Sequence, residues 1–155
     1  MNEMKCAVIY YSKSGVTKKI AEKVKAAFDA DVYSVEPEKP YGSYLSAVVR
    51  AGLEKLAGKP AALKTAAADF SSYDVVFIGF PVWYGTLPDF LQEYVKNAGI
   101  AGKRVIPFAT AGANGKEGSL KTLKKLLPDS EITDYFFTSN REPADPDAWI
   151  KGIKL

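Results

Sequence analysis

Hydrophobic and polar residues follow two rhythms along this chain, one typical of buried strands and one typical of amphipathic helices. Five short segments rich in β-branched and aromatic residues predict strands at residues 5–11, 31–36, 74–79, 103–109 and 132–138. The polar residues within 31–36 indicate an edge strand, whereas the continuously apolar run at 74–79 is typical of a central parallel strand. Pro107 lies in the fourth segment, and we expect irregular pairing near the carboxyl end of that strand because proline donates no hydrogen bond.

Apolar residues at helical spacing predict helices at about 16–28, 43–57, 88–98, 118–127 and 145–153. In the second of these, Ser43 is a candidate N-cap, and we expect the apolar stripe to pack on the sheet. That stripe consists of Leu45, Val48, Val49, Gly52, Leu53 and Leu56. Residues 58–73 show no clear pattern. We interpret them as a long connection, with a loop that covers a site as the alternative.

Strands and helices alternate five times, which predicts an α/β fold with a doubly wound, five-stranded parallel sheet. At 155 residues the chain is most simply a single domain, residues 1–155. Right-handed crossovers place the carboxyl ends of the parallel strands on one edge of the sheet, where ligands bind in folds of this class. The loops after the first, third and fourth predicted strands leave that edge, and all three have unusual compositions.

These three loops carry the candidate chemistry. The first, residues 11–17, has hydroxyls at Ser12, Ser14 and Thr17 before a helix, which predicts a phosphate site at the helix N-terminus; the alternative is a simple helix cap. The second, residues 80–88, presents Trp83 and Tyr84 for stacking, and the alternative for Trp83 is a core position. The third, residues 110–115, offers small residues and backbone amides that a flat ring can approach closely.

Composition narrows the classes of function. The chain has no histidine and one cysteine, Cys6, which removes histidine-ligated metal sites, histidine-based triads and an internal disulfide, and fits a reducing cytoplasm. Its apolar runs are too short for a membrane span, and its amino terminus lacks the apolar core of a secretory signal. The net charge of +3 is too small to indicate nucleic-acid binding.

The motifs in these loops resemble those of a known family. Ser12-x-Ser14-Gly15-x-Thr17 resembles the phosphate-loop signature of flavodoxins. The stretch 79–88, Gly-Phe-Pro-Val-Trp-Tyr-Gly-Thr-x-Pro, is similar to the ring-binding loop of short flavodoxin-like proteins, and residues 107–112 resemble their third loop. The resemblance covers nearly the whole chain. It implies a flavodoxin-like fold, with strand order 2-1-3-4-5, and flavin mononucleotide (FMN) as the cofactor.

The resemblance also implies a set of cofactor-binding residues. The hydroxyls of Ser12, Ser14 and Thr17, together with the backbone amides of Lys13, Gly15 and Val16, would hold the phosphate. Trp83 or Tyr84, in a loop shaped by Pro81, Val82 and Gly85, would stack on the isoalloxazine ring. The backbone amides of Thr110, Ala111 and Gly112 would contact one polar edge of that ring. No metal ligand and no catalytic side chain is implied, because the flavin supplies the chemistry.

The chain departs from typical flavodoxins in charge. It is net basic, and no acidic residue occurs in the second loop before Asp89 or in the third before Glu117. One unit charge about 6 Å from the flavin is worth roughly 2–3 kcal/mol at an effective dielectric constant near 20, or on the order of 100 mV for one electron. We therefore expect a less negative potential for the second electron than in acidic flavodoxins. Lys13 beside the phosphate is a further departure, and the chain has no room for the extra loop that splits the fifth strand of longer flavodoxins.

Two main functions agree with these features. The first is an FMN-binding electron-transfer protein that docks with a redox partner protein or a small electron acceptor. The second is an FMN-dependent NAD(P)H oxidoreductase acting on quinones or similar acceptors, so the sequence leaves open whether the chain is an enzyme. A flavin-free interaction domain is a third reading. We expect a cytoplasmic monomer or homodimer that binds neither nucleic acid nor membrane.

Overall fold

The computed structural model describes residues 4–155; residues 1–3, at the amino terminus where the sequence predicts no secretory signal, lie outside the described part. The elements are β1 (Cys6–Tyr10), α1 (Val16–Phe28), β2 (Asp31–Ser34), α2 (Tyr44–Ala57), β3 (Val75–Pro81), α3 (Asp89–Asn97), β4 (Arg104–Ala111), α4 (Lys116–Leu126), β5 (Glu131–Ile132), β6 (Phe136–Ser139) and α5 (Pro146–Gly152). None of the helices described between residues 4 and 155 combines the length and apolarity that a membrane crossing requires.

The sheet is parallel throughout and has the predicted order, β2-β1-β3-β4-β5, with β6 pairing with β4 beyond β5. β3 is paired with β1 along five residues and with β4 along seven, from Val75 opposite Arg104 to Pro81 opposite Thr110. The order reverses between β1 and β3, so their carboxyl ends diverge into loops on opposite faces of the sheet. The doubly wound fold expected from the sequence is confirmed.

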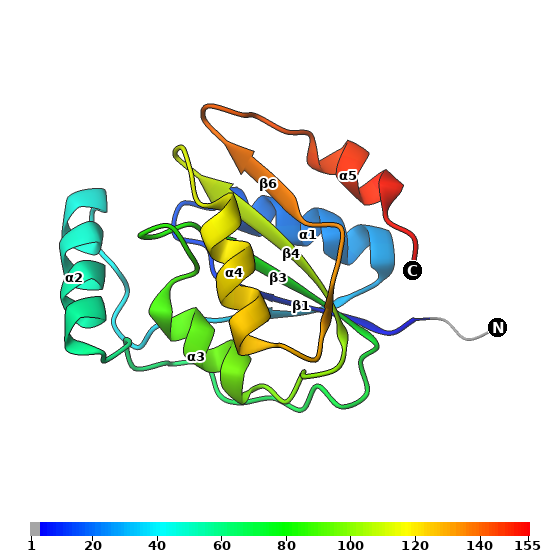
Figure 1. Cartoon of the computed structure of the whole chain (residues 1–155), viewed down its shortest axis with the longest axis horizontal. Helices are drawn as coiled ribbons and strands as arrows, with labels where there is room; N and C mark the ends of the chain where they lie inside the picture. The colour runs from blue at the N-terminus through cyan, green and yellow to red at the C-terminus, as the bar shows by residue number, and fades with distance from the viewer. Residues whose placement is uncertain (1–3) are drawn as a thin grey trace.

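Helices cover both faces of the sheet, as Figure 1 shows: α3 and α4 lie on one face and α1 and α5 on the other. Side chains on successive strand positions alternate between two cores, as the pleat of a strand requires. Along β1, Ala7 and Ile9 enter the core under α3 and α4, whereas Val8 and Tyr10 enter the core under α1 and α5. Both faces are therefore buried, and the carboxyl edge of the sheet is left for a site.

The last strand is divided, whereas the sequence predicted one strand at 132–138. β4 advances three residues, from Val105 to Phe108, while its partner advances four, from Ile132 to Phe136. The carbonyl of Val105 accepts a hydrogen bond from the N–H of Thr133 (3.0 Å). Because alternate residues of a strand face the same neighbour, Pro107 also faces this strand, at a position where it has no N–H to donate. The irregular pairing expected around Pro107 lies here, and the β3 side of β4 is regular.

α2 corrects the second helix prediction. Ser43 is its N-cap, as expected, and its side chain accepts a hydrogen bond from the N–H of Ser46. The apolar stripe does not pack on the sheet: Leu45, Leu53 and Leu56 are 73%, 62% and 88% exposed. Figure 1 shows α2 standing apart from the sheet, beyond α3. The opposite side of the helix, with buried Ala47 and half-buried Ala51, faces the body of the protein.

Residues 58–73 form a connection and do not cover the site. Leu63 makes an isolated antiparallel bridge with Pro37, and the carbonyl of Ala62 accepts a hydrogen bond from the N–H of Glu38 (2.7 Å). Phe70 anchors the end of the segment in the core, where it is 1% exposed. The segment is therefore ordered although it is irregular, because backbone hydrogen bonds join it to the chain after β2 and Phe70 fixes its end in the core.

Candidate functional site

A cavity of about 590 Å³ opens at the carboxyl edge of the sheet, within the usual range for small-molecule sites. Its lining brings together all three predicted loops with α2 and the end of β6. The residues that line it are Lys13, Ser14, Val16, Ala47, Val48, Ala51, Pro81, Val82, Trp83, Tyr84, Thr110, Ala111, Gly112, Thr138, Ser139 and Asn140. Of the residues predicted from the sequence, Ser12, Gly15, Thr17 and Gly85 are the ones outside this lining.

The first loop leads from β1 directly into the N-terminus of α1. Gly15 is the N-cap residue, at φ 94°, and no side chain caps the helix. The Ser12 hydroxyl instead accepts a hydrogen bond from the N–H of Gly15 (3.0 Å), which folds the loop back on itself and leaves the hydroxyl proton able to donate. The first N–H groups of an uncapped helix are a site for an anion, so this loop retains the donors that the phosphate prediction requires.

Thr17 differs from the prediction. Its side chain is 2% exposed, and its hydroxyl lies 2.9 Å from that of Thr110 in the buried interior. This contact joins the first loop to the third across the end of the sheet. Thr17 therefore positions the two loops relative to one another, while Ser14 and Lys13 lie at the cavity itself.

The second loop is a tight turn that holds its aromatic pair at the cavity. Backbone hydrogen bonds run in both directions between Trp83 and Thr86 (2.8 and 3.2 Å), and the two residues between them, Tyr84 and Gly85, have φ of 52° and 79°. Two successive positive φ angles define the type I′ turn. A positive φ is costly for tyrosine, because its Cβ crowds the backbone. The Tyr84 hydroxyl donates to the carbonyl of Val48 on α2 (2.6 Å), a contact that helps to hold the residue there.

Trp83 and Tyr84 lie differently. Tyr84 is 53% exposed, whereas Trp83 is half-buried and makes edge-to-face contacts with Tyr11, Tyr41 and Phe90 at centroid distances of 5.5, 4.8 and 6.2 Å. Trp83 therefore combines the two predicted positions: part of its indole packs against core aromatic residues, and it also lines the cavity. Of the two, Tyr84 is the more exposed and leaves more of its ring free for stacking.

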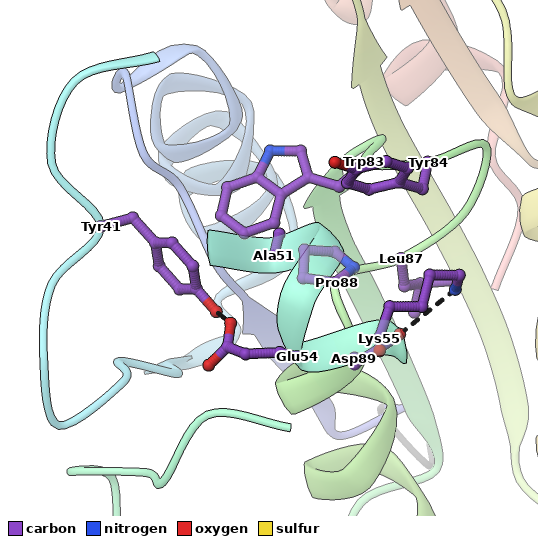
Figure 2. A pocket seen from close by; sticks show the side chains of 9 residues that line it. All are labelled: Tyr41, Ala51, Glu54, Lys55, Trp83, Tyr84, Leu87, Pro88 and Asp89. Carbon is purple, nitrogen blue, oxygen red and sulfur yellow. Dashed lines mark hydrogen bonds and ion pairs between the residues drawn. The ribbon is translucent and has the colours of Figure 1, made fainter. Parts of the chain in front are cut away.

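A second hollow, of only about 20 Å³, lies behind Trp83 between α2 and the start of α3. Figure 2 shows the Tyr41 hydroxyl directed at Glu54 and Lys55 at Asp89 (3.6 Å), both of which tie α2 to the segments beside it. A space of this size holds at most about one water molecule. It is a packing gap under α2 and not a ligand site.

The third loop is fixed by its neighbours on both sides. The carbonyl of Thr110 accepts a hydrogen bond from the N–H of Val82 (2.8 Å), and the carbonyl of Ala111 accepts one from the N–H of Asn140 (3.3 Å). Thr138, Ser139 and Asn140 thereby reach the cavity, although sequence reasoning did not include them. The signal was available, because the carboxyl end of the fifth strand must meet the same edge as the others.

α2 forms the cavity wall that sequence reasoning missed. Ala47, Val48 and Ala51 line it, and Gly52 allows the helix to approach closely, since a Cβ at that position would lie 2.6 Å from the Tyr84 hydroxyl oxygen. A stripe of small residues on α2 facing inward was the available signal. The larger apolar residues on the other side of the helix obscured it.

The electrostatics of the cavity are simple. Among the described residues that line it, Lys13 is the single charged side chain, and no carboxylate is present. Burial, reinforced by the nearby Glu36 carboxylate, raises the pKa of Tyr11 to about 12, and burial together with the hydrogen bond to Glu54 raises the pKa of Tyr41. Both phenols beside Trp83 are therefore neutral at pH 7, and the cavity favours anionic ligands.

Comparison with known proteins agrees with this geometry. Residues 5–151 match the family model described as Flavodoxin. The chain belongs to the flavodoxin family. A comparison with curated proteins found no match. Family membership accounts for the strand order and for the position of the cavity at the switch between β1 and β3.

Solved structures of flavoproteins share the fold. A proposed flavoprotein from Bacteroides eggerthii DSM 20697 is 31% identical, with a TM-score of 0.79 over 94% of this chain and 92% of that one. A second, from Bacteroides uniformis ATCC 8492, is 26% identical, with a TM-score of 0.83 over 99% and 100%. A flavoprotein from Lactobacillus acidophilus NCFM, crystallised in complex with FMN, is 22% identical, with a TM-score of 0.72 over 94% and 98%.

The residues present fit the cofactor that the flavodoxin family implies. An uncapped helix N-terminus with Ser12 and Ser14 suits a phosphate. The apolar walls around Trp83 and Tyr84 suit a flat aromatic ring, and the small residues Ala111 and Gly112 let its polar edge reach the main chain. The family thus supports FMN, as the sequence predicted.

Proposed function

We propose that this flavodoxin is an FMN-binding electron-transfer protein. The observation that carries the proposal is the large cavity at the carboxyl edge, where an anion site, an aromatic turn and a glycine-containing loop converge. Lys13 is the one charged side chain among the described residues lining that cavity, and the lining contains no carboxylate or imidazole that could act as a base. The chemistry that such a site can support is that of its flavin, which accepts and releases electrons.

In this proposal the phosphate lies at the start of α1. The N–H groups of its first turn and the hydroxyls of Ser12 and Ser14 donate to the phosphate, and Lys13 adds a positive charge. The isoalloxazine ring lies between the second and third loops. Tyr84 stacks on one face of the ring, and Trp83, held edge-on by Tyr11 and Tyr41, supports that surface from behind.

A second candidate is an FMN-dependent NAD(P)H oxidoreductase that reduces quinones or similar small acceptors. The charge of the cavity favours it, because the described lining contains Lys13 and no carboxylate. A phosphate-rich nicotinamide nucleotide can approach such a site without repulsion. For either function we place the protein in the cytoplasm, where the lone cysteine Cys6 stays reduced, with a redox partner protein or a small acceptor as its partner and with neither nucleic acid nor membrane.

Anaerobic stopped-flow mixing of the FMN-loaded protein with NADPH distinguishes the two candidates. Slow loss of flavin absorbance that becomes fast when a reductase is added supports the electron carrier. Rapid loss without a reductase supports the oxidoreductase. A protein that purifies colourless and takes up no added FMN contradicts both, and favours a domain that retains only the fold.

A further inference from the structure

Trp83 lies between two different environments. It lines the large cavity, where the proposed function places the flavin, and it also borders the small hollow under α2. Figure 2 shows Tyr41 on the side of that hollow, with its hydroxyl directed at the Glu54 carboxylate. An oxidisable indole at the cavity is thus in contact with a phenol that donates a hydrogen bond to a carboxylate.

Three tyrosines lie beside this indole, and they differ in what can accept their proton. Tyr41 donates to the Glu54 carboxylate, whereas Tyr84 donates to the backbone carbonyl of Val48, which is a very weak base. Tyr11 is 3% exposed, and no hydrogen bond joins its hydroxyl to a carboxylate within the described part of the chain. Because a base must lie within hydrogen-bond reach of the proton that it takes, Tyr41 is the one of the three that can release its proton.

Proton loss decides whether a buried phenol can be oxidised. A phenol that gives up an electron but keeps its proton carries a positive charge, and burial makes such a charge costly. The Arg50 guanidinium lies over the Tyr41 ring, 4.0 Å from its centroid, and would repel that charge. When the proton moves to Glu54 with the electron transfer, the ring stays neutral. Neutralising Glu54 weakens its ion pair with Arg50 (3.6 Å), but this pair is partly exposed and therefore contributes little.

We propose that Tyr41 is a redox-active residue that removes oxidising equivalents from Trp83. One electron passes from Trp83 to a one-electron oxidant in the cavity, such as a flavin that has absorbed light. One electron then passes from Tyr41 to the oxidised indole, whose ring centroid lies 4.8 Å from that of the phenol, and the phenolic proton moves to Glu54. The oxidant is reduced by one electron, Trp83 is restored, and Tyr41 becomes a neutral radical. The identity of the oxidant is the one part that rests on the proposed function.

This transfer protects the wall of the cavity. An indole that stays oxidised reacts further and loses the aromatic surface that faces the ligand. Tyr41 is 8% exposed and is not among the residues that line the cavity, so the radical lies behind the site. The Glu54 side chain is 19% exposed, and a reductant in solution can approach the pair from that side and restore the phenol.

Pulse radiolysis of the flavin-free chain tests the transfer without the cofactor. Azidyl radicals oxidise tryptophan selectively, and the loss of tryptophan-radical absorbance and the rise of tyrosyl-radical absorbance are followed together. The chain has two tryptophans. Trp149 contacts Phe77, Phe108 and Phe136 and, within the described residues, no tyrosine ring, so the transfer should start at Trp83. The wild-type chain should show a conversion whose rate does not depend on protein concentration, as an intramolecular step requires.

Three variants distinguish the tyrosines. Tyr41→Phe should abolish the conversion, because the ring and its packing remain but the phenolic proton is absent. Tyr11→Phe is the matched control, since Tyr11 contacts the same indole at a centroid distance of 5.5 Å, and it should leave the rate unchanged. Glu54→Gln retains an oxygen that accepts the hydrogen bond but removes the base. It should slow the conversion at least about 100-fold, the usual contribution of a positioned base.

A wild-type chain that forms no tyrosyl radical overturns the proposal. So does a conversion that persists in Tyr41→Phe, that disappears in Tyr11→Phe, or that keeps the wild-type rate in Glu54→Gln. Circular dichroism reports whether each variant folds, and if Tyr41→Phe does not, the comparison of Glu54→Gln with the wild type decides alone. Because flavin is absent throughout, these results are independent of FMN binding, which a separate titration reports.

Discussion

The contact between Gly52 and Tyr84 supports a quantitative prediction about the α2 wall. The Tyr84 hydroxyl donates to the carbonyl of Val48 at 2.6 Å, and a Cβ on Gly52 would lie 2.6 Å from the same oxygen and 3.2 Å from the ring carbon that bears it. In Gly52→Ala the tyrosine must therefore move and give up its hydrogen bond. In Tyr84→Phe the oxygen is absent, and the new methyl group needs a shift of only a few tenths of an ångström.

The magnitudes follow from these two geometries. Tyr84→Phe should lower the free energy of unfolding by about 0.5–1 kcal/mol, since an exposed hydrogen bond lies at the low end of the usual range. Replacing glycine by alanine within a helix contributes up to about 1 kcal/mol. In the wild-type background this gain is offset by the lost hydrogen bond and by the displaced ring. In the Tyr84→Phe background the gain remains, so the coupling between the two sites should be about 1 kcal/mol or more.

Urea unfolding followed by circular dichroism of the four proteins in this double-mutant cycle measures the coupling. Gly52→Ala should stabilise the Tyr84→Phe protein and leave the wild type unchanged or weaker. Equal effects of Gly52→Ala in the two backgrounds, within about 0.5 kcal/mol, would show that the tyrosine does not hold α2 at the cavity.

Three further predictions concern the charge, the buried polar contact and the ionisation beside the cavity. Lys13→Ala should lower the potential of the FMN-loaded protein for the second electron by roughly 20–100 mV, depending on solvent screening, in a spectroelectrochemical titration where Lys18→Ala serves as the control; an equal shift in both would assign the effect to net charge. Thr17→Val should cost about 1–2 kcal/mol of unfolding free energy by leaving the Thr110 hydroxyl buried and unpaired, and the double variant with Thr110→Val should recover part of it, whereas additive losses would refute the pairing. Burial holds the pKa of Tyr11 at about 12, while an unfolded tyrosine ionises near pH 10, so the contribution of Tyr11 to stability should be complete below pH 10 and be lost, by up to about 2–3 kcal/mol, between pH 10 and 12; urea unfolding of Tyr11→Phe should show a fall that is smaller than the wild-type fall by this amount.

The centre of the sheet could be predicted from the sequence because its strands β1, β3 and β4 are buried on both faces. Burial on both faces requires a continuous apolar run, and β1, β3 and β4 all show one. The sequence indicated irregular pairing near Pro107, but it did not show that the last strand would be divided there. The division arises because the backbone of Pro107 faces the last strand and not β3. Which neighbour it faces depends on the register of the folded sheet.

α2 shows why a stripe of large apolar residues is an incomplete guide. The amphipathic pattern was correct as a helix signal, but it did not say which side faces the protein. Specific contacts decide the orientation: the Tyr84 hydroxyl on the Val48 carbonyl, and Tyr41 between Arg50 and Glu54. These groups are distant in sequence, so no local pattern reports them.

Within the site, residues that belong to the three loop motifs could be predicted. Residues of α2 and of the end of β6, which reach the cavity only through tertiary packing, could not. Lys13, Ser14, Trp83 and Tyr84 lie at the cavity as expected. Thr17 belongs to the same motif, but the helix turns its hydroxyl inward to Thr110. A motif fixes the backbone path closely, whereas the direction of each side chain depends on its position around the helix.

FMN binding at the start of α1 can be tested by a fluorescence titration of FMN with the flavin-free protein, with riboflavin in parallel. We expect saturation at one FMN per chain, with the flavin emission quenched beside Trp83 and Tyr84. Riboflavin, which lacks the phosphate, should bind at least about 100-fold more weakly, because it cannot use the charge-assisted hydrogen bonds at the start of α1. Absence of saturable FMN binding would show that this cavity is not a flavin site, and equal affinity for riboflavin would show that the start of α1 does not hold the phosphate.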